Sequence, residues 1–254
     1  MKQFETLRVF PEAAMFLYSF SFSPYNLTDI LISLLVVTLS LSFHEYAHGR
    51  MALAMGDDTA RLAGRLTLNP LAHLDPIGTL VFIFARVGWA RPVPVNPARF
   101  TKAKSRKSGL VWVSLAGPLA NLLLAFISVT LLNLLFFILS LMDVSALTAS
   151  SVRLPSLIFR ILNAFFLSNI FLAIFNLLPV PPLDGYKIFG ALLPDRHYFN
   201  IMRYEQYIGM AFLFLVMFGG NFISRLMNRI ASPVAFLLNW PSSTLFELLL
   251  RLIR

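Results

Sequence analysis

Long apolar runs constrain this chain more than any other feature of its sequence. A helix that crosses the hydrocarbon core of a bilayer needs about 20 predominantly apolar residues. Four such runs are read as spans: Leu27 to about Met51, Leu110–Leu141, Leu157–Leu178 and Tyr207–Phe222. Only helices and closed barrels satisfy their backbone groups in lipid. We therefore expect an all-α polytopic membrane protein, a bundle of about 4–6 transmembrane helices.

The composition excludes other classes. Of 254 residues, 57% are apolar and 13% are charged, whereas soluble domains carry about 25% charged residues. A water-soluble enzyme, a disordered chain and a coiled coil are all excluded on this ground. Cysteine is absent, so a metal site must be built from histidines and carboxylates. We expect one membrane-embedded domain over residues 1–254, because little length is left for an appended domain.

Shorter segments divide this domain. The apolar stretch Ile77–Trp89 is too short for a straight crossing and predicts a re-entrant or hairpin element between the first two long spans. Residues 1–26 are expected to form an interfacial or re-entrant segment, 27–193 the catalytic core and 225–254 a helical tail. Pro233 and Pro241 are expected to break that tail.

The charge pattern predicts orientation rather than a nucleic-acid partner. The formal net charge is +9, and basic residues crowd the loop before the second long span: Arg99, Lys102, Lys104, Arg106 and Lys107. An excess of Lys and Arg in short loops is typical of cytoplasmic segments. Residues 50–108 are therefore expected on the cytoplasmic side, and contact with anionic lipid is compatible with this. No nucleic-acid binding is expected.

Three ionisable residues end the first apolar run. His44 and His48 are four residues apart, so on a helix both imidazoles project from one face and can hold a single cation. Glu45 lies between them, set around the helix, where its carboxylate can reach a water on the metal. Zinc suits these ligands and lowers the pKa of its water. The alternative is that the three residues end the span in water, although ionisable residues there usually have a function.

Catalytic zinc usually has a third protein ligand, and Asp184 is the best donor. It follows a proline-rich stretch, 179–182, that ends the third span and produces irregular backbone near membrane depth. Gly185 permits the turn that would direct Asp184 inward. A turn that merely ends a helix would also explain the prolines and the glycine. The predicted topology places both motifs at cytoplasmic ends of their spans, at a similar depth.

These motifs together resemble the site-2 protease family of zinc intramembrane metalloproteases. The matching runs are His-Glu-Tyr-Ala-His at 44–48, Pro-Pro-Leu-Asp-Gly at 181–185, Ala-Gly-Pro-Leu-Ala-Asn at 116–121 and the stretch 63–78. The last of these is typical of compact prokaryotic members, without a PDZ or nucleotide-sensing CBS domain. The resemblance covers roughly Leu27 to Leu193.

The resemblance implies one zinc ion per chain, with His44, His48 and Asp184 as ligands and Glu45 as the general base. It also makes Asn121 a candidate for contacting the substrate backbone or the developing oxyanion. The alternative for Asn121 is a hydrogen bond between helices, which is common for Asn in membranes.

Two loop features carry alternative interpretations. His73 and Asp75 could form a loop-fixing hydrogen-bonded pair, support a metal-bound imidazole, or supply a rival ligand. Pro92, Val93, Pro94 and Val95 lie in an extended segment, and the family resemblance suggests a hairpin there that pairs with an unwound substrate strand. An extended cytoplasmic segment without that role is the alternative.

The predicted function is hydrolysis of peptide bonds in or next to transmembrane segments of membrane proteins. Such a substrate helix must be unwound locally, because its peptide bonds are shielded by intrahelical hydrogen bonds. The expected location is the cell (inner) membrane, multi-pass, with the active site nearer the cytoplasmic side. The lipid bilayer and a transmembrane substrate are the expected partners, and a homo-oligomer or a regulatory membrane partner stays open. A membrane metal-ion transporter and a non-catalytic scaffold are the alternatives.

Overall fold

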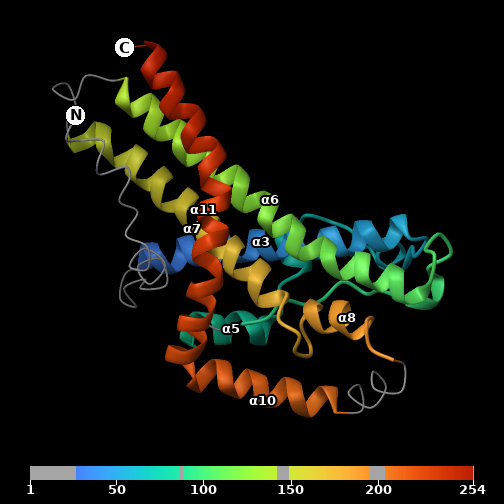
Figure 1. The fold of residues 1–254 in the computed structure, drawn as a ribbon. Helices are drawn as coiled ribbons and strands as arrows, with labels where there is room; N and C mark the ends of the chain where they lie inside the picture. Colours follow the sequence, from blue (N-terminus) through green and yellow to red (C-terminus); the bar gives the residue numbers. More distant parts are fainter. Residues whose placement is uncertain (1–26, 86–87, 142–148, 195–203, 254) are drawn as a thin grey trace.

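The computed structural model describes residues 27–85, 88–141, 149–194 and 204–253 (Figure 1). Expectations for residues 1–26 lie outside these ranges. The elements are α3 (Leu27–Ala54), α4 (Thr59–Leu62), η1 (Pro70–Ala72), α5 (Pro76–Ala85), η2 (Pro97–Arg99), α6 (Arg106–Ser140), α7 (Ala149–Asn176), α8 (Asp184–Gly190), α10 (Glu205–Phe218) and α11 (Gly220–Ile253). The described residues contain no β-strand. The all-α class is therefore confirmed.

Three helices are long and apolar enough to cross a membrane. They are α3, α6 and the part of α7 from Arg153 to Asn176, with 28, 35 and 24 residues. At about 1.5 Å per residue, each exceeds the roughly 30 Å of a hydrocarbon core. Three of the four predicted spans are thus found at nearly the predicted positions, and the chain is a multi-pass membrane protein.

The fourth predicted span, Tyr207–Phe222, is not one helix of spanning length. α10 covers 14 residues and ends at Phe218, and Gly219 separates it from α11. A helix of that length extends about 21 Å, which is short of a hydrocarbon core. The apolar run concealed the break because glycine interrupts a helix without interrupting a hydrophobic pattern.

The expected break in the C-terminal tail is also absent. α11 runs without interruption from Gly220 to Ile253 with Pro233 and Pro241 inside it. A proline in a helix interior costs about 3 kcal/mol because it removes a hydrogen bond and crowds the preceding turn. Packing offsets this cost. Met227 and Ala231 are almost fully buried against other helices, at 1% exposure each.

The segment between the first two long spans contains a short element, as predicted. α5 has ten residues, from Pro76 to Ala85, which is too few to cross a bilayer. Leu74 and Ala90, on either side of it, form an isolated antiparallel bridge. The chain therefore leaves and returns at one place, with α5 as the excursion.

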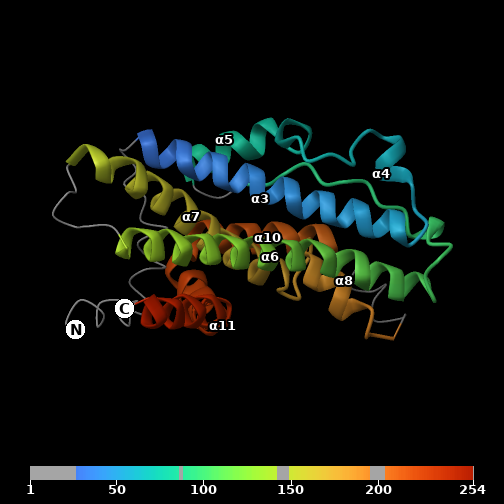
Figure 2. The ribbon, with the colours of Figure 1, turned by 90° about the horizontal axis from the view of Figure 1, so that it is seen from above.

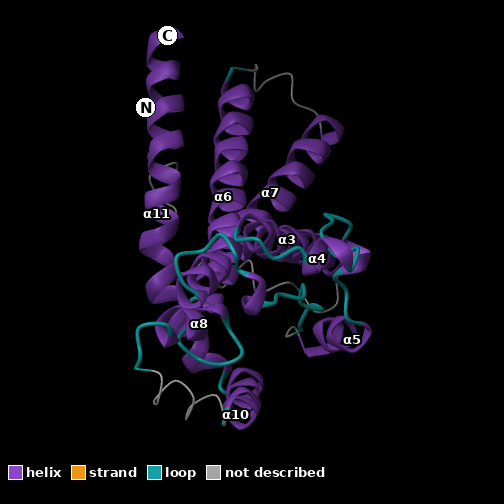
Figure 3. Cartoon of the chain, turned by 90° about the vertical axis from the view of Figure 1, so that its right-hand side faces the viewer, coloured by secondary structure: helices purple, strands orange, loops and turns teal. Residues whose placement is uncertain are grey.

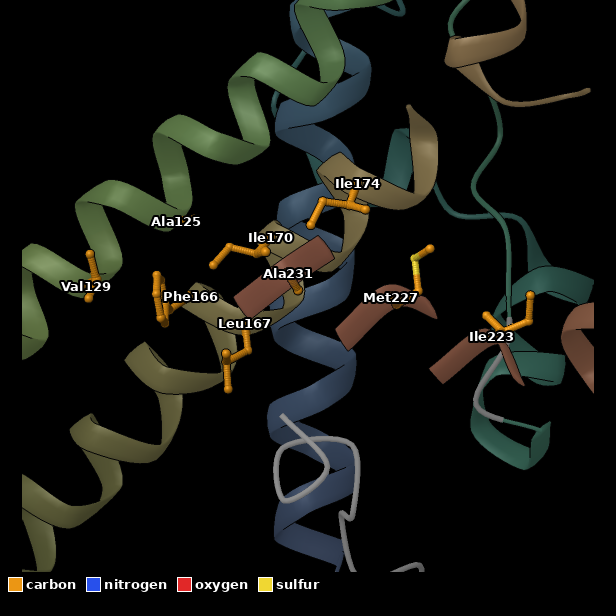
Figure 4. Packing of buried hydrophobic residues seen from close by; sticks show 9 residues of the cluster. All are labelled: Ala125, Val129, Phe166, Leu167, Ile170, Ile174, Ile223, Met227 and Ala231. Carbon is orange, nitrogen blue, oxygen red and sulfur yellow. The ribbon is translucent and has the colours of Figure 1, made fainter. Parts of the chain in front are cut away.

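Small and polar residues let the three long helices approach closely. The buried positions of α6 include Gly109, Ala116, Gly117, Ala125 and Ser128. In membranes, such residues bring helix backbones near enough for dispersion and hydrogen bonding to hold them. α11 adds to this group through an apolar cluster with α6 and α7 (Figure 4): Ala125, Val129, Phe166, Leu167, Ile170, Ile174, Ile223, Met227 and Ala231.

The helices form two groups in space. α3 crosses α6 and α7, and all three pack on one another (Figures 1 and 2). α11 packs along α6 and α7. α5 and α10 lie to one side of this group, with α8 next to the end of α7 (Figure 3). The place where α3, α6 and α8 meet contains the candidate site.

Candidate metal centre

His44 and His48 lie one turn apart on the buried face of α3. Their exposed fractions are 4% and 8%. Their two Nε2 atoms are 2.9 Å apart, and the rings meet edge to face with centroids 4.5 Å apart. The helical spacing thus places both imidazoles at one point, as the sequence predicts.

Asp184 reaches the same point from the other end of the core. Its Oδ2 atom lies 3.1 Å from His44 Nε2 and 3.0 Å from His48 Nε2. The turn after α7 makes this possible. A Cβ at Gly185 would lie closer than 3 Å to the carbonyls of Leu177 and Leu178, so only glycine permits the chain to fold back this tightly. Asp184 then opens α8 directly beside the histidines.

Both imidazoles are oriented by hydrogen bonds at Nδ1. His48 Nδ1 lies 2.7 Å from the carbonyl oxygen of Val113, which can only accept. His44 Nδ1 lies 2.6 Å from Oδ1 of Asn121. Each neutral ring therefore carries its proton on Nδ1 and keeps a lone pair on Nε2. Two nitrogen lone pairs and a carboxylate oxygen converge, and a cation between them relieves their mutual repulsion.

The geometry fits zinc. Bonds of about 2.0–2.1 Å in a tetrahedron separate ligand atoms by roughly 3.3 Å, close to the 2.9–3.1 Å observed here. Among the described residues, His44, His48 and Asp184 form a group whose ligand atoms lie within 4.8 Å of one another. These three ligands leave the fourth position of a catalytic zinc site open.

Gly117 of α6 provides the space for this ion. A Cβ built on Gly117 would lie 2.6 Å from His44 Nε2 and closer still to His48 Nε2. Any side chain there would displace the proposed ligands. The bare backbone of α6 thus forms one wall of the site, a role that the sequence reasoning did not assign to the Ala-Gly-Pro run.

Asn121 is brought to the site but not to an accessible surface. It is fully buried, at 0% exposure. Its Oδ1 faces His44, and its Nδ2 donates to Asn169 Oδ1 at 2.7 Å and to the Ser40 carbonyl at 3.4 Å. A group that contacts substrate must be reachable. These contacts therefore favour the alternative role, a hydrogen bond between helices, and do not favour the substrate or oxyanion contact.

His73 and Asp75 are not brought to the metal group. His73 is buried and bonds through Nε2 to the carbonyl of Thr67, at 2.8 Å. Asp75 Oδ1 accepts from the backbone N–H of Gly78, at 2.8 Å, in the first turn of α5. Their observed contacts fix the loop, which is the first of the three alternatives, and the imidazoles of His44 and His48 are supported by other residues.

Glu45 faces the extended segment that contains Pro92, Val93, Pro94 and Val95. Its Oε2 accepts a hydrogen bond from the backbone N–H of Val93, at 2.7 Å. Val93 is buried, at 7% exposure, next to α3. The structure thus joins the predicted base to the predicted substrate-binding segment, although no sequence pattern linked the two.

Asp57 fastens the far end of this segment. Its Oδ2 accepts from the backbone N–H of Asn96, at 2.6 Å, and its Oδ1 accepts from Thr59. Burial raises the pKa of the Asp57 carboxyl, but the hydrogen bonds from Thr59 and Asn96 and the nearby Arg99 outweigh burial, so this pKa lies below its usual value. Asp57 is therefore an ionised anchor that fixes the segment to the end of α3.

Asn169 and Ser40 were also missed by sequence reasoning. Both are fully buried and hydrogen-bonded to each other behind His44, with 2.8 Å between Asn169 Nδ2 and Ser40 Oγ. The available signal was an asparagine within the apolar run of the third span, since a polar side chain there needs a partner. That signal identifies the residue but not its neighbour.

Comparisons with known proteins agree with this site. The model described as Peptidase family M50 matches residues 32–218. Three similar proteins carry the name "Putative zinc metalloprotease": YwhC of Bacillus subtilis, Rip2 of Mycolicibacterium smegmatis and MJ0611 of Methanocaldococcus jannaschii.

The chain is 44% identical to YwhC over 78% of its own length and 82% of that protein. It is 33% identical to Rip2 over 61% of its length and 54% of that protein. For MJ0611 the identity is 32% over 67% of this chain and 75% of that protein. No solved structure matches.

Proposed function

Because the chain belongs to peptidase family M50, the site-2 protease family, and is a zinc metalloprotease, we propose that it cleaves peptide bonds within or beside transmembrane segments. The observation that carries this proposal is the convergence of His44, His48 and Asp184 on one point between membrane-spanning helices. Substrates that reach such a site must come from the bilayer, so we propose membrane proteins as the substrate class.

We propose His44, His48 and Asp184 as the zinc ligands. When bound, zinc supplies a Lewis acid that polarises the scissile carbonyl and lowers the pKa of water to near 7. The protein keeps both Nε2 atoms deprotonated through the hydrogen bonds at Nδ1. Its buried walls limit the access of bulk water, which strengthens the electrostatic interactions inside.

We propose Glu45 as the general base. It follows His44 directly, so it points about 100° around the helix from that ligand, beside the site rather than at its centre. The hydrogen bond from Val93 to Oε2 holds the carboxylate in one orientation. Glu45 takes a proton from the attacking water and delivers it to the leaving amine.

The segment Pro92–Val95 is proposed to bind substrate. Pro92 and Pro94 have no N–H group, the N–H of Val93 is used by Glu45, and the Pro92 carbonyl accepts from Arg65. The carbonyls of Val93 and Pro94 therefore remain the proposed acceptors for an extended substrate strand. This segment would place the unwound peptide alongside Glu45.

The test is cleavage in a bilayer. Purified protein in liposomes is incubated with a transmembrane peptide that carries glycine or proline near its centre, and products are identified by mass spectrometry. Zinc-loaded protein should yield product, a chelator should stop it reversibly, and Glu45→Gln should abolish it while retaining zinc. Glu247→Gln, which removes a carboxylate on α11, is the matched control and should cleave normally.

Two results would overturn the proposal. Cleavage by the Glu45→Gln protein at the rate of the unmodified protein would remove the proposed base. Equal cleavage of a water-soluble peptide carrying the same scissile sequence would remove the intramembrane specificity.

The proposed orientation, with the site nearer the cytoplasm of the cell (inner) membrane, has a direct test. The chain contains no cysteine, so Ser105→Cys introduces one thiol just before α6. A membrane-impermeant thiol reagent should label it in inverted membrane vesicles and not in intact spheroplasts. The reverse pattern would contradict the orientation.

A further inference from the structure

A chain of buried amides joins three helices behind His44. Asn121 of α6, Asn169 of α7 and Ser40 of α3 are all at 0% exposure. Asn121 Oδ1 lies 2.6 Å from His44 Nδ1, and Asn121 Nδ2 donates to Asn169 Oδ1 at 2.7 Å. Asn169 Nδ2 in turn donates to Ser40 Oγ and to the Phe165 carbonyl, both at 2.8 Å.

The direction of this chain is fixed at its far end. A backbone carbonyl can only accept, so the Phe165 carbonyl requires the NH₂ group of Asn169 to face it. The carbonyl oxygen of Asn169 must then face Asn121, which presents its own NH₂ group. That leaves the Asn121 oxygen facing His44, and an oxygen there requires a proton on Nδ1. The Nε2 lone pair of His44 is thereby directed to the metal centre.

We infer that Asn169 is a positioning residue for zinc: acting through Asn121, it fixes the tautomer and ring plane of His44. This inference rests on the proposed role of His44 as a ligand. Asn169 itself contacts neither His44 nor the metal point through any observed hydrogen bond. Outer partners of metal-binding histidines typically change metal affinity by about 10- to 100-fold when they are removed.

The experiment compares two variants at the same position. Asn169→Leu removes both the acceptor and the donor. Asn169→Asp keeps an oxygen facing Asn121 in either protonation state. The zinc dissociation constant is measured in detergent by competition with a chelator of known affinity, and the melting temperature of the zinc-free protein is measured in parallel.

A purely structural role for Asn169 is separated by a matched control on α6. Asn133 also joins two helices, through Nδ2 to Asn239 Oδ1 at 2.9 Å and to Ser242 Oγ at 2.8 Å. It lies twelve residues beyond Asn121, about 18 Å along the helix. Asn133→Leu should lower the melting temperature without changing zinc affinity.

The expected result is a zinc dissociation constant raised about 10- to 100-fold by Asn169→Leu, substantially restored in Asn169→Asp and unchanged in Asn133→Leu. The inference is overturned if Asn169→Leu lowers only the melting temperature, or if Asn169→Asp binds zinc as weakly as Asn169→Leu. Failure of the proposed function is a separate outcome, because zinc affinity can follow this pattern in a protein that cleaves no transmembrane peptide.

Discussion

The carboxylate of Glu45 and the backbone N–H of Val93 are joined by a hydrogen bond of 2.7 Å across 48 residues of sequence. Glu45 belongs to α3, a membrane-spanning helix, and Val93 to an extended segment outside the long helices. Any movement of this segment therefore moves a hydrogen-bond donor of the proposed base. Binding of a substrate strand and orientation of Glu45 are coupled through one backbone group.

Replacing Val93 with proline tests this coupling. Val93→Pro removes the N–H donor and should lower kcat about tenfold or more, since a hydrogen bond to a charged group contributes about 1.5–3 kcal/mol. Zinc content should not change, because Val93 contacts none of the three proposed ligands through an observed hydrogen bond. Steady-state kinetics and metal analysis of the same preparation measure both quantities.

Val93→Ala is the control for this substitution. It keeps the N–H and loses most of the buried side chain, so it should reduce stability more than kcat. If Val93→Ala and Val93→Pro have equal effects on kcat, the hydrogen bond has no part in catalysis.

Gly117→Ala should abolish tight zinc binding. The added methyl group would lie 2.6 Å from His44 Nε2, so the histidines must move off the metal point. We expect zinc affinity to fall by at least about 100-fold, measured by chelator competition. Ala120→Ser, which adds one heavy atom three residues further along α6, should bind zinc normally. Unchanged zinc affinity in Gly117→Ala would contradict the observed wall.

Asp57→Asn should destabilise the protein in a pH-dependent manner. The folded-state pKa of Asp57 lies below its ordinary value, so the ionised carboxylate stabilises the fold above about pH 4, and this contribution is lost as the pH falls through the folded-state pKa. The difference between the original and variant proteins should be about 1–3 kcal/mol at neutral pH and shrink below about pH 4. Thermal unfolding at several pH values measures it. A difference that grows on acidification would show that the carboxylate is not ionised in the fold.

Zinc should stabilise the folded protein. Free zinc at 100 times its dissociation constant adds about 2.7 kcal/mol if it binds only the folded state, and the melting temperature should rise with zinc concentration. His44→Ala should remove this dependence. His73→Ala should keep it despite a lower starting stability, because His73 bonds to the Thr67 carbonyl in the loop. Loss of the dependence in His73→Ala would restore the interpretation of His73 as a metal-supporting residue.

The metal group was predictable from sequence because local spacing dictates it. Residues four apart on a helix share a face, so His44 and His48 needed only the helix, which the apolar run supplied. Asp184 required one further step, the similar depth of two helix ends. Its distance of about 3 Å from both histidines shows that membrane topology can substitute for a long-range contact.

Helix continuity was harder to predict because hydrophobicity does not report it. The run Tyr207–Phe222 is apolar throughout, yet α10 ends at Phe218. Conversely, Pro233 and Pro241 lie inside an unbroken α11, where burial of Met227 and Ala231 offsets the local cost. Tertiary packing decides such cases, and one sequence contains no direct record of it.

The buried partners of the metal group could be identified only as types of residue. Asn121 has a hydrogen-bonding side chain in an apolar helix, and both a substrate contact and a helix contact suit that description. The choice depends on which neighbours face it. His44 and Asn169 come from helices that lie 77 and 48 residues away along the chain.

His44 and Asp184 are separated by 140 residues. A polypeptide emerging from the ribosome therefore has its histidine pair in the bilayer well before the aspartate has been translated. Until then it has two of its three proposed ligands, which disfavours hydrolysis of neighbouring proteins during its own synthesis. Late arrival of the third ligand makes the enzyme's activation a consequence of completing its membrane insertion, without a removable inhibitory segment.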